Sequence, residues 1–241
     1  MPALKRTAAA SKAAPVTRRN SQRKMPARTL RATARATKSG LSPPQPTLHA
    51  TDRILEAAAE FFALHGYANS SLDDVAALAG LTKGAVYYYF KDKESLLLET
   101  LHQIEDRSID TTAEKVREGG GSATDQLQRF VRYQTRWAAQ HPRDLAILML
   151  VSAETAQASE RVRTQVLGIY RKLAQLLEAL IEEGKASGEF SPNQETKDTV
   201  LYLQAVHDGN MMIWYRSGTD AEVGRRLARA TLSGFLRTVK D

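Results

Sequence analysis

Side chains that can contact nucleic acid gather between Ser71 and Leu97, in the stretch SLDDVAALAGLTKGAVYYYFKDKESLL. Lysine ammonium and tyrosine hydroxyl groups reach phosphate oxygens and base edges, and small residues such as Gly84 and Ala85 let a backbone approach the bases. The chemistry that these residue types support is therefore DNA recognition. The residues that we expect to contact DNA are Thr51, Ser71, Thr82, Lys83, Gly84, Ala85, Tyr87, Tyr88, Lys91 and Lys93.

Two short helices joined by a glycine turn would position these side chains. The apolar residues of the first helix recur at i, i+3, i+4 and i+7, which predicts one buried stripe; they are Leu72, Val75, Ala76 and Ala79. Ser71 and Asp74 form a capping-box pattern at its start, and Gly80 stands where a left-handed residue closes a helix. Thr82 would cap the second helix, with Val86, Tyr89 and Phe90 buried. This is the arrangement of a helix-turn-helix, whose second helix enters the major groove.

An amphipathic helix pair alone is common in helical proteins, but the match here extends further. The segment from Thr51 to Leu97 resembles the DNA-binding domain of the tetracycline-repressor (TetR) family of bacterial regulators. The first helix of that unit would be 51–65, ended by Gly66. The residues that carry the resemblance are Ile54, Ala57, Ala58, Phe61, Phe62, Gly66, Tyr67, Ser71, Val75, Ala76, Ala79, Gly80, Thr82, Lys83, Gly84, Tyr87, Tyr89, Phe90, Lys91, Lys93, Glu94 and Leu96.

The net charge of +7 is unevenly distributed along the 241 residues. Residues 1–50 hold eleven Lys or Arg and no acid, so the remainder carries 23 basic and 27 acidic residues. Residues 1–46 have few large apolar side chains, which predicts a disordered basic tail. This tail would be a solvated extension, an arm that binds DNA phosphates, or a transit peptide; translation starting at Met25 is a further alternative.

The rest of the pattern predicts an all-α fold of about nine helices. The helix-turn-helix domain would occupy residues 47–97, and a ligand-binding and dimerisation domain would occupy 98–241. Beyond the first three helices, we expect helices near 95–118, 123–140, 144–156, 159–186, 194–216 and 220–239.

The resemblance implies that the C-terminal part binds a small molecule and pairs its last two helices with a second copy of the chain. Aromatic, thioether and polar side chains between His207 and Tyr215 are typical of a mostly apolar ligand pocket, although ordinary core residues have the same composition. The expected effector is a neutral or weakly acidic aromatic or acyl compound. An acyl-CoA would meet the basic group Arg161, Arg163, Arg171 and Lys172 with its phosphates. The alternative is that these residues form a solvated helix face, which is the more common role of such a group. The candidate ligand-binding residues are Tyr133, Trp137, Met149, Tyr170, His207, Asn210, Met211 and Trp214.

The sequence gives little support for an enzyme, a metalloprotein or a membrane protein. The chain has no cysteine, its five histidines lack metal-ligand spacing, and neither a nucleophile elbow nor a phosphate loop is present. We therefore expect no catalytic residues, no metal and no cofactor. No apolar run reaches about 18 residues, so no membrane partner is expected. The family resemblance implies a cytoplasmic location. The function predicted is a homodimeric, ligand-responsive repressor of a palindromic operator; the alternative is an architectural protein that binds DNA through its tail without a ligand.

Overall fold

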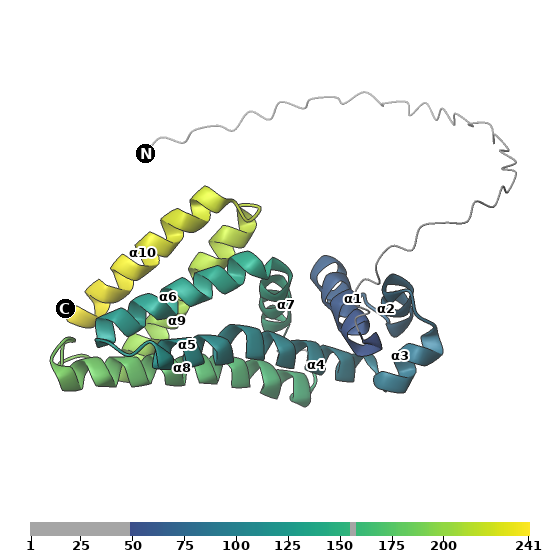
Figure 1. Ribbon diagram of the computed structural model, residues 1–241, viewed down its shortest axis with the longest axis horizontal. Coiled ribbons are helices and arrows are strands. Elements are labelled where there is room, and N and C mark those ends of the chain that lie inside the picture. Colours follow the sequence, from purple (N-terminus) through teal and green to yellow (C-terminus); the bar gives the residue numbers. More distant parts are fainter. Residues whose placement is uncertain (1–48, 155–157) are drawn as a thin grey trace, which may run out of the picture. The chain divides into compact units, whose positions relative to one another are not determined.

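The computed structural model describes residues 49–154 and 158–241, and all the regular structure in these ranges is helical (Figure 1). The α-helices α4, η1 and α5 follow one another without a break, η1 being a π-helical turn, so the described residues form nine helical rods. This confirms the predicted all-α fold, whereas the predicted tail, 1–46, lies outside the described residues. The elements are α1 (Ala50–His65), α2 (Leu72–Ala79), α3 (Lys83–Tyr89), α4 (Lys93–Glu105), η1 (Asp106–Asp110), α5 (Thr111–Glu118), α6 (Ala123–Gln140), α7 (Pro142–Ala153), α8 (Glu160–Ser187), α9 (Thr196–Arg216) and α10 (Ala221–Lys240).

The turn between α2 and α3 forms as its residues predict. The Ser71 hydroxyl accepts a hydrogen bond from the Asp74 N–H, and Gly80 closes α2 in the left-handed conformation at φ 64° and ψ 36°. The Thr82 hydroxyl accepts from the Ala85 N–H at 3.2 Å and so caps α3. Each cap satisfies a backbone donor that the first helical turn leaves free, which fixes where the helix starts.

The predicted burial of Tyr89 is wrong, because this side chain is 45% exposed. Helix α3 has only seven residues and ends at Tyr89, and Phe90 then adopts an extended conformation at φ −128° and ψ 112°. That change of direction turns Phe90 inward, where it is buried beside Val86. The Tyr89 ring instead packs edge-on against Tyr88 at the surface.

The predicted helix 95–118 starts two residues earlier and contains the π-helical turn η1 in its middle. Asp92 and Ser95 form a reciprocal capping box, so α4 begins at Lys93. Within the interrupted region the Ser108 hydroxyl donates to the Ile104 carbonyl at 2.6 Å, and the Thr111 hydroxyl donates to the Asp106 carbonyl at 2.8 Å. Hydroxyl side chains compete for backbone carbonyls in this way, and π-turns often occur at functional sites.

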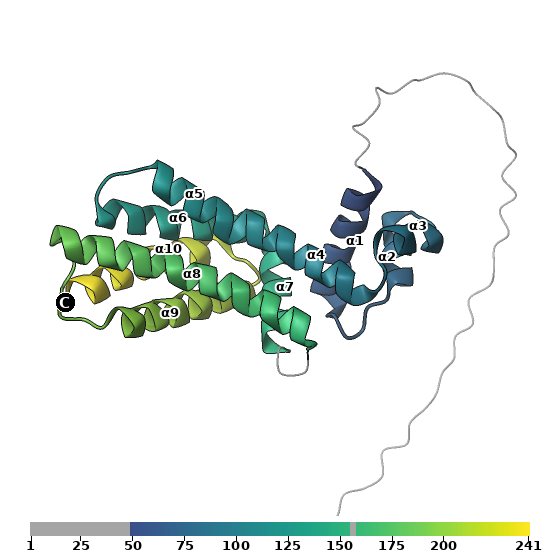
Figure 2. The ribbon, with the colours of Figure 1, turned by 90° about the horizontal axis from the view of Figure 1, so that it is seen from below.

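Helices α6, α7 and α8 pack against the α4–α5 rod, and α9 and α10 pack on these helices in turn. Helix α8 lies between the α4–α5 rod and α9 (Figure 2). Helix α10 packs on α6 and α9, with the Phe130 and Phe235 rings stacked at 6.5 Å. Helix α7 starts at Pro142 rather than Asp144, since proline suits the first helical position. No helix in the described part of the chain meets the length and apolarity needed to cross a membrane.

The loop after α8 is held by contacts between distant segments. The Glu189 carboxylate accepts hydrogen bonds from the N–H groups of Ala123 and Thr124 in the first turn of α6, and these bonds lower its pKa to about 2. Phe190 is buried against Gly184, where a Cβ on the glycine would overlap its ring. Glycine is therefore required at position 184 for packing rather than for a turn.

We expect Gly184→Ala to lower the free energy of unfolding by at least about 2 kcal/mol, because the added methyl group overpacks the Phe190 ring. Urea denaturation followed by circular dichroism measures this. Gly168→Ala on the same helix is the matched control, since a Cβ there meets no atom within 4 Å. It should stabilise the protein by about 0.5–1 kcal/mol through helix propensity. Equal effects of the two substitutions would contradict the packing role of Gly184.

Candidate functional site

The outer face of α3 presents the side chains that were predicted to read DNA. Tyr88 is 83% exposed and Tyr87 is 45% exposed. The Lys83 ammonium forms an ion pair with Asp73 at 2.7 Å and lies 5.5 Å from the centroid of the Tyr87 ring. A Cβ on Gly84 would meet no atom within 4 Å, so the helix backbone is open to approach at that position. The face is thus aromatic, weakly basic and sterically accessible.

The flanking candidates have different surroundings. Lys91 is exposed and makes no hydrogen bond or ion pair with the described residues. Lys93 donates to the carbonyl oxygens of Tyr67 at 2.7 Å and Ala68 at 3.3 Å, and burial lowers its pKa. Its ammonium therefore secures the turn between α1 and α2, a structural contact that the sequence did not predict. Thr51 lies in the first turn of α1, and Ser71 caps α2.

A cavity of about 330 Å³, partly open to the surface, lies among η1, α6, α7, α8 and α9. We call it the inner cavity. It is lined by five of the eight predicted ligand residues, namely Trp137, Met149, Tyr170, His207 and Met211. Asp208 and Met212 of α9, which belong to the cluster between His207 and Tyr215, also line this cavity. The sequence did not indicate two other wall residues, Ser108 and Ile109 of η1. The sequence predicted an ordinary helix through these two residues, so nothing indicated that the π-helical turn would bring them to the cavity wall.

The other three predicted ligand residues lie elsewhere. Tyr133 lines a separate surface hollow with Arg136. Asn210 and Trp214 line a groove of about 550 Å³ among α6, α9 and α10, which we call the α6–α10 groove. His207 and Met211 line both the groove and the inner cavity. The predicted cluster is divided because successive residues turn by about 100° around a helix axis, so neighbours in sequence face different spaces.

The inner cavity combines apolar walls with a few polar groups. The Trp137 indole N–H is buried and has no hydrogen-bond partner among the described residues. Burial lowers the pKa of His207 to about 4, so this imidazole is neutral near pH 7. Burial also raises the pKa of Tyr170, whose hydroxyl lies 3.3 Å from the Ser152 hydroxyl. A buried donor without a partner is costly, and a ligand oxygen in the cavity would satisfy it.

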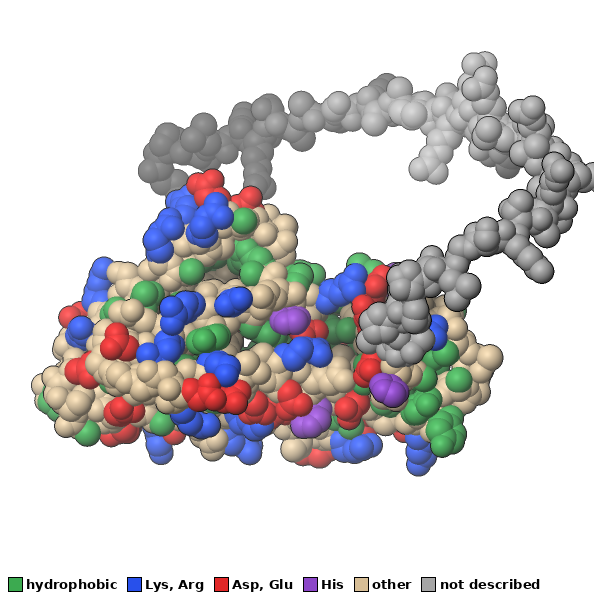
Figure 3. All heavy atoms as spheres, viewed as in Figure 1, with side chains coloured by type: hydrophobic (Ala, Val, Ile, Leu, Met, Phe, Trp, Pro, Cys, Tyr) green, Lys and Arg blue, Asp and Glu red, His purple; other side chains and the backbone are tan. Residues whose placement is uncertain are grey.

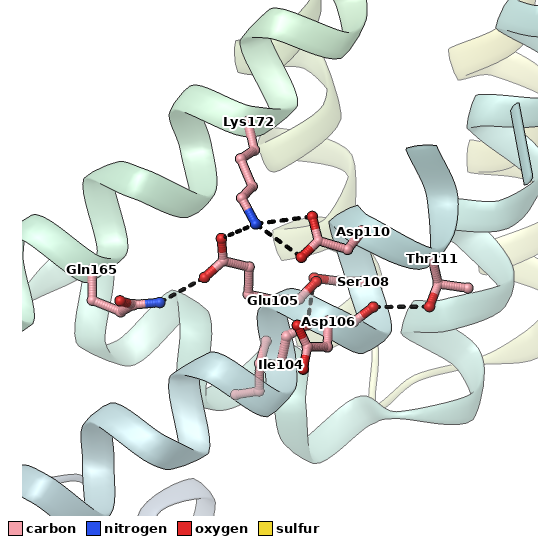
Figure 4. A network of polar contacts seen from close by, with 8 residues as sticks. All are labelled: Ile104, Glu105, Asp106, Ser108, Asp110, Thr111, Gln165 and Lys172. Atoms are coloured by element: carbon pink, nitrogen blue, oxygen red, sulfur yellow. Dashed lines mark hydrogen bonds and ion pairs between the residues drawn. The ribbon is translucent and has the colours of Figure 1, made fainter. Parts of the chain in front are cut away.

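Ion pairs connect the wall of the inner cavity to the other helices. Lys172 of α8 contacts Glu105, the residue before the π-turn, at 2.6 Å and Asp110, its last residue, at 2.8 Å. Gln165 donates to Glu105 at 2.6 Å (Figure 4). Arg107 of η1 pairs with Asp144 of α7 at 3.0 Å. The buried Glu105 carboxylate needs these partners, since an isolated buried charge is strongly unfavourable.

The basic group on α8 is largely neutralised by carboxylates. Arg161 pairs with Glu94 at 3.0 Å, Arg163 pairs with Glu160, and Lys172 pairs with Glu105 and Asp110. The Arg163 pair lies within α8, whereas the Arg161 and Lys172 pairs connect α8 to α4 and η1. They do not form a free cluster for the phosphates of an acyl-CoA.

Comparison with known proteins assigns the class and then the family. The helix-turn-helix and the helical cavity-bearing part define a ligand-binding transcriptional regulator. Residues 54–100 match the model described as "Bacterial regulatory proteins, tetR family", and residues 120–235 match "Tetracyclin repressor-like, C-terminal domain". The chain belongs to the TetR family of transcriptional regulators, which bind DNA and act as dimers, and it is not an enzyme.

Individual relatives extend over most of the chain. The fatty acid metabolism regulator protein of Bacillus subtilis is 27% identical over 163 residues, which cover 67% of this chain and 81% of that protein. The crystal structure of the MbdR regulator from Azoarcus sp. CIB superposes with a TM-score of 0.71 at 29% identity, covering 80% of this chain and all of that one. FadR of Bacillus subtilis in complex with stearoyl-CoA has the same fold, with a TM-score of 0.67 at 21% identity over 78% of this chain and 98% of that one.

The buried His207 predicts a measurable pH dependence of stability. Its pKa is about 4 in the folded chain against the ordinary 6.5, so below pH 6.5 the unfolded chain binds a proton that the folded chain does not. This group therefore lowers the free energy of unfolding by about 2–3 kcal/mol between pH 7 and about pH 4.5. Urea denaturation across that range should show a smaller acid loss for His207→Gln than for the wild type.

Asp208 provides the control because its effect has the opposite sign. Burial of its carboxyl raises the pKa from 3.8 to about 6, although the residue keeps an exposed surface. The folded chain therefore binds the proton first as the pH falls through 6, which adds stability and partly offsets the His207 effect. Asp208→Asn should enlarge the acid loss. If His207→Gln and the wild type lose stability in parallel, His207 does not titrate as its burial requires.

Proposed function

We propose that this protein is a repressor whose dimer binds a palindromic operator in the cytoplasm and leaves it when a small aromatic or acyl molecule occupies the inner cavity. Each chain would insert α3 into a major groove. Tyr88 would contact bases, and Lys91 would contact phosphate. The other DNA contacts would come from Thr51, Ser71, Thr82, Lys83, Gly84, Ala85, Tyr87 and, at the edge of the unit, Lys93.

Recognition of a palindromic operator requires a dimer, because one recognition helix contacts only a few base pairs. Two such helices about 34–36 Å apart read a palindrome across one turn of DNA. Helix α9 exposes large apolar side chains on the single chain, with Leu201 68%, Tyr202 56% and Ile213 48% exposed. Exposed apolar surface of this kind is typical of a protein interface. The family resemblance favours α9 and α10 as the pairing helices.

The observation that carries the proposed release is that η1 contributes to the wall of the inner cavity. Ser108 and Ile109 line the cavity, and η1 continues directly into α4. Helix α4 begins at Lys93, only a few residues after α3 ends at Tyr89. A ligand that displaces η1 would therefore move the segment that carries the recognition helix. By reciprocity, DNA would weaken ligand binding by the same factor.

The chemistry of the inner cavity favours a neutral or weakly acidic effector. Most of its wall is apolar, and the Trp137 N–H, which has no partner among the described residues, would donate a hydrogen bond to a carbonyl or ether oxygen of the ligand. Both an aromatic compound and an acyl chain fit this description. The stearoyl-CoA bound by the Bacillus subtilis FadR of the same fold supports an acyl ligand.

We expect Tyr88→Ala to weaken binding to an operator selected from random DNA by about 1–3 kcal/mol, through loss of a base contact. Lys91→Ala should weaken binding to every sequence and reduce the salt slope by about one unit. Fluorescence anisotropy at several salt concentrations measures both. Both side chains are exposed, so neither change should alter the fold. Equal losses on operator and random DNA for both variants would refute this division of roles.

We expect Ala153→Phe to reduce the affinity for methyl benzoate or octanol at least tenfold, because the larger side chain fills the inner cavity from the end of α7. In Trp214→Phe protein Trp137 is the sole tryptophan, and its fluorescence reports binding there. The same substitution should reduce release of the operator by these probes. Leu150→Phe is the matched control, since this exposed residue of α7 does not line the cavity. Probes that bind without changing operator affinity would contradict the proposed release.

A further inference from the structure

The α6–α10 groove has features that the proposed release mechanism does not use. We propose that it is a second ligand site, for a molecule with an apolar tail and one anionic head group. This inference goes beyond the proposed function, because it concerns a space separate from the inner cavity. The groove runs between residues 131–142 of α6 and the start of α7 on one side and residues 219–231, mostly of α10, on the other, with α9 as its floor.

Small side chains on the two facing helices create this space. They are Ala138 and Ala139 on α6 and Ala221, Gly224 and Ala228 on α10. Gly224 also makes room for Trp214, because a Cβ there would come within 2.9 Å of the indole nitrogen. That nitrogen donates to the Asp220 carbonyl at 3.0 Å, which fixes the Trp214 ring in the wall. Farther along the same helix pair, the stacked Phe130 and Phe235 rings restore close packing.

The rim of the groove is positively charged. Three arginines line it, Arg132, Arg136 and Arg225, and no carboxylate does. None of the three forms an ion pair within residues 49–154 and 158–241. Figure 3 shows basic side chains along α6 and over α10, with apolar surface between them. Guanidinium groups bind carboxylate and phosphate with paired hydrogen bonds, so this rim suits an anion.

The floor of the groove suits an apolar tail. Met211 and Trp214 of α9 contribute apolar surface there, and Val131 of α6 and Leu227 of α10 add to it from the two sides. The polar groups beside them already satisfy one another, since the Asn210 amide donates to the Thr231 hydroxyl at 2.8 Å. The volume of about 550 Å³ lies within the range of small-molecule sites. The inner cavity has a different balance, because no arginine or lysine lines it.

The two tryptophans of the chain allow the two spaces to be observed separately, since Trp137 lines the inner cavity and Trp214 lines the groove. We would titrate decanoate into full-length Trp137→Phe protein, in which Trp214 is the sole reporter. We expect saturable binding that Arg136→Ala/Arg225→Ala weakens at least tenfold. Arg229→Ala is the matched control, because this exposed arginine of α10 does not line the groove and should leave the affinity unchanged.

Two further probes test the head group. Decanol, which has the tail without the charge, should bind more weakly than decanoate and should not respond to the arginine substitutions. Decanoyl-CoA distinguishes the source of the anion: preference for decanoate assigns a carboxylate head, and preference for decanoyl-CoA assigns phosphates. Calorimetry on protein with both tryptophans repeats the comparison without altering either cavity.

Three results would overturn the proposal. The first is a change in Trp137 fluorescence in Trp214→Phe protein without a change in Trp214 fluorescence in Trp137→Phe protein, which would place decanoate in the inner cavity. The second is equal weakening by the Arg136/Arg225 and Arg229 substitutions. The third is absence of decanoate binding at concentrations where sedimentation shows a dimer, which would mean that a second copy covers the groove. No DNA is present in these titrations, so they test the groove independently of the proposed release from the operator. Failure of either proposal would leave the other one standing.

Discussion

The continuity of one helical rod is the constraint on which the rest of this structure depends. Helix α4 starts beside the recognition helix α3 and passes without a break into η1, a wall of the inner cavity. Its inward side chains Leu96, Leu97, Leu101 and Ile104 are completely buried, so the rod cannot shift without disturbing the core on both sides. Close-packed interiors transmit displacement in this way rather than absorbing it. The exposed face of α3 and the inner cavity are therefore connected by packing.

Polar contacts determine how that rod is held. The buried Glu105 carboxylate meets Lys172 and Gln165 of α8, while Arg107 meets Asp144 of α7. Such pairs contribute little net stability, because desolvation offsets their attraction, but breaking one leaves an uncompensated charge. They consequently favour one arrangement of helices over alternatives. The proposed release from DNA would require such discrete arrangements.

Local patterns were sufficient to predict most of the helices and the turn between α2 and α3. The capping residues Ser71 and Thr82 and the left-handed Gly80 act within a few residues of themselves, so their roles follow from the order of residue types. The π-turn at Asp106–Asp110 was not foreseen, because no glycine or proline marks it and its hydroxyl contacts depend on the packed helix. Tyr89 was misplaced for a related reason: only the packed structure shows that α3 ends there and that Phe90 takes the buried position.

The sequence by itself determined the family, the all-α architecture and the surface of α3, since these depend on short-range spacing and on intrinsic residue chemistry. Only the tertiary structure decided which residues share a cavity. Asp208 and Met212 face the inner cavity, whereas Asn210 and Trp214, on the same two turns of α9, face the α6–α10 groove. The same is true of charge, because Arg161 and Lys172 of α8 meet carboxylates distant in sequence while Arg136 and Arg225 do not. Which side chains meet across the fold depends on how the helices pack, and this cannot be read from their separation in the sequence.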